Sequence, residues 1–236
     1  MSTEHKKKEE TIISVDQYIR RITEFYEERK KVINITASVC VVVVALALTY
    51  FLYYIPKQQR EAEKAIFKAE RYFGMDSVQL ALKGDGIHSG LLSVIDEFGN
   101  TKAGNRAKYM AGICYSKLGQ YDDAIRYLKK FKSKDKLVSV QALGSIGDAY
   151  MENKDMENAV KYYKKAVSKN PNELITPIYL QRLARVYEMQ GNWTEALACL
   201  ETLQQEYAHL QQGYQPLPES MDVEKHISFV KGKIGK

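Results

Sequence analysis

The residues that most often perform chemistry in proteins are sparse in this chain and do not gather at catalytic or metal-binding spacing. The four histidines are scattered along the sequence, at His5, His88, His209 and His226. No HExxH pair, nucleophile elbow or glycine loop followed by Lys-Ser or Lys-Thr occurs. Neighbouring carboxylates such as Asp122 and Asp123 are typical of solvated surfaces. The sequence therefore predicts a protein that is not an enzyme and needs no cofactor or metal.

The glycine-rich segment KGDGIHSG, residues 83–90, invites comparison with a phosphate-binding loop. Such a loop follows a strand and is followed by a helix that opens with Lys-Ser or Lys-Thr. Neither feature is found around this segment. We expect a simple break between two helical pieces.

The cysteines and the charge balance exclude further classes of function. Cys40, Cys114 and Cys199 are odd in number and lack CxxC spacing, which argues against a zinc site or a disulfide framework. On apolar helix faces, Cys114 and Cys199 are expected to be small buried residues. The formal net charge is +6, from 35 Lys and Arg against 29 Asp and Glu. This mixture argues against nucleic acid as a partner, and no small-molecule substrate is predicted.

Three stretches of the chain are similar to one another and recur at intervals of 35 and 37 residues. They read AGICYSKLGQYDDAIRYLKKF from Ala111, IGDAYMENKDMENAVKYYKKA from Ile146 and LARVYEMQGNWTEALACLETL from Leu183. Each contains a tyrosine, a small residue three positions before it and an alanine nine positions after it. These signature residues are Gly112, Tyr115 and Ala124; Gly147, Tyr150 and Ala159; and Ala184, Tyr187 and Ala196.

A period of this length is typical of stacked helical hairpins. Small residues at fixed points allow two antiparallel helices to approach closely, and the tyrosine helps to fill the space between successive hairpins. Gly119 and Gly191 are expected at the turns within hairpins, where Lys154 stands in the middle repeat. The pattern resembles the tetratricopeptide repeat, which has about 34 residues per unit. This resemblance implies a solenoid of helical hairpins that binds proteins.

The residues before and after the three repeats continue the pattern less regularly. Ala69, Tyr72 and Ala81 occupy the signature positions of a fourth unit. An apolar face of Ile227, Val230 and Ile234 predicts a terminal capping helix from residue 221 to 233. The expected segments are a degenerate first hairpin with an insertion in residues 57–104, three repeats in 105–207, and a loop with the capping helix in 208–236.

First-helix residues that do not face a neighbouring hairpin line the concave side of such a solenoid. By the repeat register, the candidate protein-binding groove consists of Arg106, Tyr109, Ile113, Lys117, Gln141, Asp148, Met151, Gln181, Arg185 and Glu188. The set is amphipathic and lacks the lysine and asparagine pattern with which some tetratricopeptide domains bind a terminal carboxylate. The alternative is that these are simply exposed helix positions.

Residues 32–55 carry no formal charge. As a helix they would extend roughly 36 Å at about 1.5 Å per residue, enough to cross a hydrocarbon core of about 30 Å. A cleaved signal peptide would start closer to the N-terminus and end at small residues. The expected fold class is therefore all-α, with a single N-terminal transmembrane helix followed by the tetratricopeptide-repeat solenoid.

Flanking charges predict the orientation of this span, because Lys and Arg are retained on the cytoplasmic side. Five lie shortly before it and three shortly after it, and Arg29, Lys30 and Lys31 form a tight cluster. We expect residues 1–31 to be cytoplasmic and the repeats to lie on the opposite side. The step Ile55-Pro56 is expected to separate the anchor from the first hairpin.

The tail before the span has apolar residues at helical spacing. They are Ile12, Val15, Ile19, Ile22 and Tyr26. Ser14 and Gln17 can form a capping box, so a short amphipathic helix is expected to begin there. It is predicted to dock on lipid head groups or on a membrane partner rather than on a second copy.

The order of these elements, together with the run GNTKAGNRAKYMAGICYSKLGQYDDAIRYLKKF in residues 99–131, resembles the YfgM-like family of bacteria. Members of that family are ancillary subunits of the SecYEG translocon with a periplasmic tetratricopeptide domain. The resemblance implies the bacterial inner membrane as location and the Sec translocon, periplasmic chaperones or exported clients as partners. A structural scaffold for another envelope machine, in cell division or outer-membrane assembly, is the alternative.

Overall fold

The computed structural model describes residues 3–207 and 223–235, with side chains from Tyr18 onward. The described chain is built from helices and contains no strand element, only an isolated bridge between Gly84 and Ser89. The chain divides into two compact units, Met1–Lys57 and Gln58–Lys236. The predictions for the loop after residue 207, for His209 and for the side chains before Tyr18 lie outside the described residues.

The first unit is helical throughout its described part. Helix α1 runs over Thr3–Thr49 and is followed by a π-helix, η1, over Tyr50–Tyr54. The predicted helix start at Ser14 is therefore wrong, because the helix already begins at Thr3 and continues into the apolar segment. No glycine or proline precedes Pro56, so nothing in the sequence ends the helix earlier.

Pro56 does not interrupt the chain between the apolar segment and the first hairpin, contrary to the sequence prediction. Helix α2, Ile55–Gly74, begins one residue before the proline and continues through it. Proline cannot donate the helical hydrogen bond, and its ring collides with the carbonyl four residues earlier. In η1 the chain widens, and the Ile55 N–H bonds to the Tyr50 carbonyl five residues back. A π turn of this kind accommodates a proline without ending the helix.

The apolar surface of α1 and η1 is not covered by any described part of the chain. Side chains such as Val41, Leu46 and Leu52 are exposed. The hydroxyls of Thr36 and Thr49 donate to carbonyls one turn earlier, at 2.7 and 2.9 Å, so these polar groups are already satisfied. By length and composition, one described helix could cross a membrane, and it contains residues 32–55.

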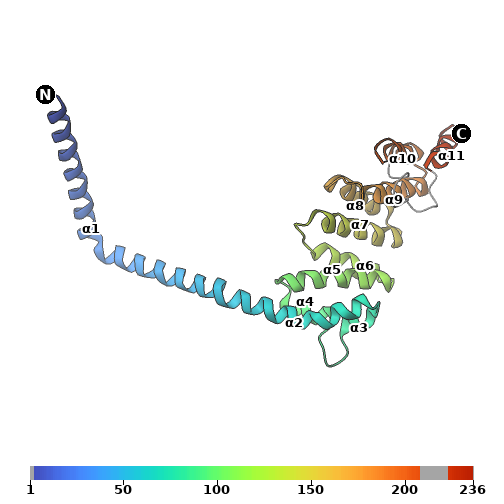
Figure 1. Ribbon diagram of the computed structural model, residues 1–236, viewed down its shortest axis with the longest axis horizontal. Coiled ribbons are helices and arrows are strands. Elements are labelled where there is room, and N and C mark those ends of the chain that lie inside the picture. Colours follow the sequence, from blue (N-terminus) through green and yellow to red (C-terminus); the bar gives the residue numbers. More distant parts are fainter. Residues whose placement is uncertain (1–2, 208–222, 236) are drawn as a thin grey trace. The chain divides into compact units, whose positions relative to one another are not determined.

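The second unit is a stack of helical hairpins in chain order (Figure 1). Its first hairpin comprises α2 and the short α3, and α4 follows the insertion. The three predicted repeats form the hairpins α5–α6, α7–α8 and α9–α10, and α11 packs on α10. The bounds after α2 are α3 Val78–Lys83, α4 Leu91–Phe98, α5 Lys102–Lys117, α6 Tyr121–Lys130, α7 Lys136–Glu152, α8 Met156–Lys169, α9 Thr176–Met189, α10 Trp193–Tyr207 and α11 Val223–Ile234.

All four hairpin turns have the same geometry. Four residues after each signature tyrosine, the backbone adopts a positive φ: 58° at Asp76, 71° at Gly119, 61° at Lys154 and 71° at Gly191. The next amide then donates to the tyrosine carbonyl, at 2.8–2.9 Å in every turn. This bond satisfies a carbonyl that the helix end leaves free. The degenerate first hairpin thus follows the repeat register, with Tyr72 at the signature tyrosine position that the sequence predicted.

The small signature residues mark the points where two helices touch. A Cβ atom added at Gly112 would lie 2.5 Å from Leu128 Cγ, and one at Gly147 would lie 2.7 Å from the ring of Tyr163. The two contacts are equivalent, because Leu128 and Tyr163 occupy the same repeat position. The close approach of helices at these glycines confirms the role inferred from the pattern.

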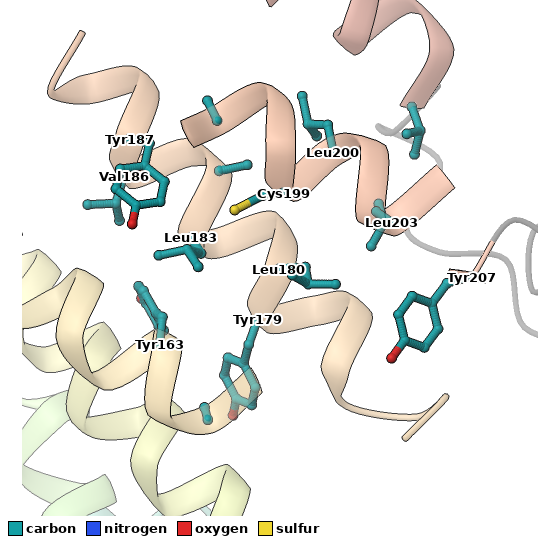
Figure 2. Close-up of a cluster of buried hydrophobic side chains, with 14 of the residues drawn as sticks. Tyr163, Tyr179, Leu180, Leu183, Val186, Tyr187, Cys199, Leu200, Leu203 and Tyr207 are labelled. Atoms are coloured by element: carbon teal, nitrogen blue, oxygen red, sulfur yellow. The ribbon is translucent and has the colours of Figure 1, made fainter. Parts of the chain in front are cut away.

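Buried side chains form three clusters along the stack, of which the largest lies over α7 to α11. Figure 2 shows Tyr163 of α8 lying beside Tyr179 of α9, and Cys199 of α10 directed toward α9. The two tyrosine rings are stacked with centroids 6.1 Å apart. This cluster joins the second and third repeats to the capping helix.

The capping helix is present, but its buried face differs from the one predicted. Val223, Ile227 and Val230 are buried, whereas Ile234 is 45% exposed. Ile234 is the last residue of α11, so no further turn covers it. The apolar face therefore starts one turn earlier than the spacing of Ile227, Val230 and Ile234 indicated.

Candidate protein-binding surfaces

The signature tyrosines are part of the framework of the solenoid. Tyr115 stacks on Tyr127 at 5.3 Å, and the equivalent Tyr150 stacks on Tyr162 at 5.5 Å. Each of these pairs joins the two helices of one hairpin. Lys129 of the preceding hairpin also contacts Tyr150. Its Nζ donates to the Tyr150 hydroxyl at 2.6 Å and lies 5.1 Å from the centroid of the ring.

Ion pairs bind the first helices of successive hairpins together along the predicted groove. The guanidinium of Arg106 on α5 contacts Glu63 at 2.7 Å and Glu70 at 3.0 Å, both on α2. The hydrogen bond from Arg106 is the main reason that the pKa of the Glu63 carboxyl lies below its usual range. Lys117 similarly pairs with Asp76 at the turn of the first hairpin. Arg106 and Lys117 are thus already engaged within the protein.

Asp148 lies at the centre of a second connection. Its carboxylate accepts a hydrogen bond from Tyr163 at 2.6 Å and pairs with Arg182 of α9. Burial, and then the nearby Asp148 charge, raise the pKa of the Tyr163 hydroxyl above its usual value. Further along, Glu188 of α9 pairs with His226 of α11 at 2.8 Å.

The remaining predicted groove residues differ in accessibility. Tyr109 is half-buried with its ring 5.1 Å from that of Phe131, and Ile113 packs against a buried cluster. Met151 and Gln181 are also half-buried. Gln141 and Arg185, in contrast, are exposed. The structure therefore brings the predicted set onto consecutive first helices and engages most of it in contacts between hairpins.

Two tetratricopeptide repeat family profiles match the stretches in which these hairpins lie, over residues 106–136 and 139–204. These segments are tetratricopeptide repeats. Their turns recur at the intervals that the sequence predicted, and the stacked tyrosine pair recurs in the first two repeats.

Similar proteins extend this comparison over parts of the chain. Photosystem I assembly protein Ycf3 of Prochlorococcus marinus (strain NATL2A) is 30% identical over 89 residues, which are 37% of this chain and 50% of that protein. Uncharacterized protein ycf37 of Guillardia theta is 30% identical over 110 residues, 45% of this chain and 60% of that protein. The chain thus spans little more than half the length of these curated relatives.

Solved structures are similar in fold. A crystal structure of MamA protein superposes with a TM-score of 0.52 at 16% identity, over 76% of this chain and 90% of that chain. The nearly identical TPR-like repeats of a protein from Podosopora anserina give a TM-score of 0.53 at 18% identity, over 76% and 88% of the two chains. At such identities the likeness concerns the fold alone.

A lysine-rimmed pocket is a feature that the sequence reasoning missed. It lies between α6, the α6–α7 linker, α7 and α8, with a volume of about 380 Å³. Its rim carries Lys129, Lys132, Lys165 and Lys169. The signal was present in the lysine-rich stretches LKKFKSKDK and KYYKKAVSK, which are close to one repeat apart and meet only in the folded hairpins.

The insertion of the first hairpin brings together three groups that resemble a catalytic cluster. Asp85 accepts hydrogen bonds from Tyr72 at 2.7 Å, from His88 Nδ1 at 2.8 Å and from the backbone amides of Ile87 and His88. Bonds from His88 are the largest cause of a lowered pKa of the Asp85 carboxyl. The side chain of Ile87, at the loop tip, is 88% exposed. Asp85 therefore holds the loop in place, as a break between helical pieces requires.

Metal and thiol chemistry find no further support among the described residues. No group of three or more His, Cys, Asp or Glu in them is arranged to hold a metal ion. Cys114 and Cys199 are free and buried, in different clusters. Burial raises the pKa of each thiol to about 11, so neither is a ready nucleophile.

Proposed function

We propose that this chain is a membrane-anchored adaptor that binds other proteins through its repeats and is held in the bilayer by residues 32–55. The observation that supports it best is that an exposed apolar helix precedes tetratricopeptide repeats in the chain, because repeat solenoids of this kind present extended surfaces to proteins. An anchor confines the repeats near membrane partners, which raises their effective concentration. A weak contact can then give useful occupancy.

The finer proposal places the anchor in the bacterial inner membrane with residues 1–31 in the cytoplasm and the repeats in the periplasm. The cluster Arg29, Lys30 and Lys31 supports this orientation. The resemblance to YfgM-like proteins supports the Sec translocon as membrane partner and periplasmic chaperones or exported proteins as clients. On the concave side, Gln141 and Arg185 are exposed members of the candidate groove, and Lys117 is exposed but pairs with Asp76.

Assembly of another membrane complex is the second candidate function. It is favoured by the relative named as a photosystem I assembly protein, which is similar to this chain over 89 residues. In that role the repeats would hold subunits of one complex rather than proteins that leave the translocon.

Site-specific photocrosslinking in native membranes separates these possibilities. A photoreactive amino acid at Val43, in the candidate span, is expected to label translocon subunits. At Gln141 or Arg185 it should label chaperones or exported proteins, while Glu157 on α8 serves as a control outside the groove. If all positions label subunits of one other complex, the assembly role replaces the translocon role. If Gln141 and Arg185 label no more protein than Glu157, the concave face is not the binding surface.

A C-terminal reporter tests the orientation independently. Fused after Lys236, it should be active only outside the cytoplasm. Cytoplasmic activity would refute both the orientation and the periplasmic role.

A further inference from the structure

The pocket between α6, α7 and α8 combines an apolar floor with a basic rim. Leu128, Phe131, Leu143 and Ile146 provide apolar surface. They come from the end of α6 and from one face of α7, which is distinct from the α7 face that carries Gln141 and Asp148 at a spacing of seven residues. The pocket is therefore a different surface from the concave groove.

Two of the rim lysines contact the same aromatic ring. Lys129 Nζ lies 5.6 Å and Lys165 Nζ 4.9 Å from the centroid of Tyr162. Cation–π contacts attract each ammonium group to the ring, but the two positive charges repel each other. Among the described residues, no carboxylate forms an ion pair with Lys129, Lys132, Lys165 or Lys169. The rim lysines thus form no ion pair with a described carboxylate, although the charge of Lys129 is one of the smaller causes that lower the pKa of the Asp155 carboxyl.

The positive region extends beyond the rim. Burial, and then the charges of Lys130 and Lys132, lower the pKa of the nearby Lys108 ammonium. Lys129 and Lys169 lie in the last turns of α6 and α8. A positive charge is favourable at a helix C-terminus, which is sufficient reason for a lysine at these two positions. The helix C-terminus effect explains neither Lys132 nor Lys165. It also does not explain the apolar residues that line the pocket with them.

The same place in the next repeat keeps only one of the four rim lysines, since Lys164 corresponds to Lys129. By the repeat register, Thr202 and Glu206 replace Lys165 and Lys169, and Cys199 replaces Tyr162. Val167 stands where Lys132 does. The lysine rim is consequently a local specialisation and is not required by the hairpin fold.

We propose that this pocket binds an acidic segment of a partner protein, with an apolar side chain on the floor and carboxylates flanking it at the lysine rim. Charge complementarity favours an anionic partner. The apolar floor favours a peptide over a lipid head group or a free anion, which would leave the half-buried Phe131 and Leu143 in contact with water. The inference rests on the proposed adaptor role and deepens it by naming the chemistry of one partner.

The test uses the full-length chain in nanodiscs of a zwitterionic lipid and a fluorescein-labelled peptide, in which one phenylalanine lies between two glutamates on each side. Fluorescence anisotropy at fixed ionic strength should show saturable binding. The variant Lys132→Glu/Lys169→Glu should weaken it at least tenfold. Neither ammonium group takes part in an ion pair or a hydrogen bond among the described residues, so the fold should be preserved.

The matched control is Lys136→Glu/Lys161→Glu, which makes the same change in net charge at exposed lysines of α7 and α8 outside the pocket. It should alter binding less than twofold. A pocket-filling variant, Ser139→Trp, should abolish binding without changing any charge. Circular dichroism melts of all variants verify the fold.

Several results would overturn the proposal. Equal weakening by the pocket and control charge reversals would mean unspecific attraction. Equal binding of a peptide with glycine in place of phenylalanine would mean that the floor is not used. Displacement of the peptide by inorganic phosphate at constant ionic strength would assign the rim to a small anion. If the peptide does not bind, but the chain binds vesicles of anionic lipid through the rim lysines, the rim is assigned to the membrane. None of these results would bear on crosslinks from Gln141 or Arg185, which test the adaptor role itself.

Discussion

Gly147 provides the most direct test of how the repeats pack, because its neighbour cannot easily move. In Gly147→Ala, the new Cβ would lie 2.7 Å from two ring carbons of Tyr163, closer than carbon atoms approach without repulsion. Tyr163 is fully buried, its hydroxyl is bonded to Asp148 at 2.6 Å and its ring stacks on Tyr179. Moving the buried ring would disturb both contacts. Such overpacking typically costs about 1–3 kcal/mol.

The same substitution also has a favourable effect, which a control can measure. Alanine is a better helix former than glycine by up to about 1 kcal/mol. At Gly232 on α11, no atom lies within 4 Å of an added Cβ, so Gly232→Ala should show only this gain. Gly147→Ala should lower the free energy of unfolding by roughly 0.5–2 kcal/mol net, from the overpacking cost minus the gain.

Urea and thermal unfolding of the full-length chain in detergent micelles, followed by circular dichroism, measure this difference. For a unit of this size, about 1 kcal/mol shifts Tm by roughly 2–4 °C. Tyr163→Ala, which removes the ring that the new Cβ would meet, should remove most of the Gly147→Ala cost in a double-mutant cycle. If Gly147→Ala instead raises Tm as much as Gly232→Ala does, the close approach of α7 and α8 has no energetic importance and the reasoning is wrong.

Three further predictions concern a turn, the thiols and the insertion. Lys154→Gly should raise the stability of the full-length chain by about 1 kcal/mol, because Lys154 adopts a positive φ of 61° at a position that is glycine in two other repeats; an unchanged or lower Tm would contradict this. In a Cys40→Ser background, Cys114 and Cys199 should resist a water-soluble maleimide at pH 8 until urea is added, since burial raises the pKa of both thiols to about 11; rapid labelling of the native chain would show that the repeats open readily. The folded-state pKa of Asp85 is lowered, so its stabilising bonds should be fully present above the unfolded value of about 4 and lost as the pH falls below it. The stability difference between the wild type and Asp85→Asn should accordingly shrink from pH 6 toward pH 2, and a constant difference would argue against this role.

The repeat fold could be predicted from the sequence because its signals are local and recur. The tyrosine, the small residue before it and the turn after it lie within about ten residues, so one hairpin can be recognised by comparison with the next. This comparison even located the first hairpin, where Tyr72 and the positive φ of Asp76 repeat the geometry of the later turns. The continuous helix through Pro56 was missed, because a π turn over Tyr50–Tyr54 leaves no distinctive residue pattern.

The sequence was less informative about which surface is free to bind. The register correctly placed Arg106 and Asp148 on first helices, but their partners Glu70 and Arg182 are 36 and 34 residues away in the chain. Because those distances match one repeat, the ion pairs join adjacent first helices, and a residue that looks available within one repeat is engaged by the next. The lysine pocket shows the converse, since its charges look like ordinary surface lysines until α6 and α8 bring them together over Tyr162. In a solenoid, therefore, binding surfaces are determined by differences between neighbouring repeats. A partner that used the concave side would have to compete with ion pairs, whereas one that used the pocket between α6, α7 and α8 would meet lysines that form no ion pair with a described carboxylate.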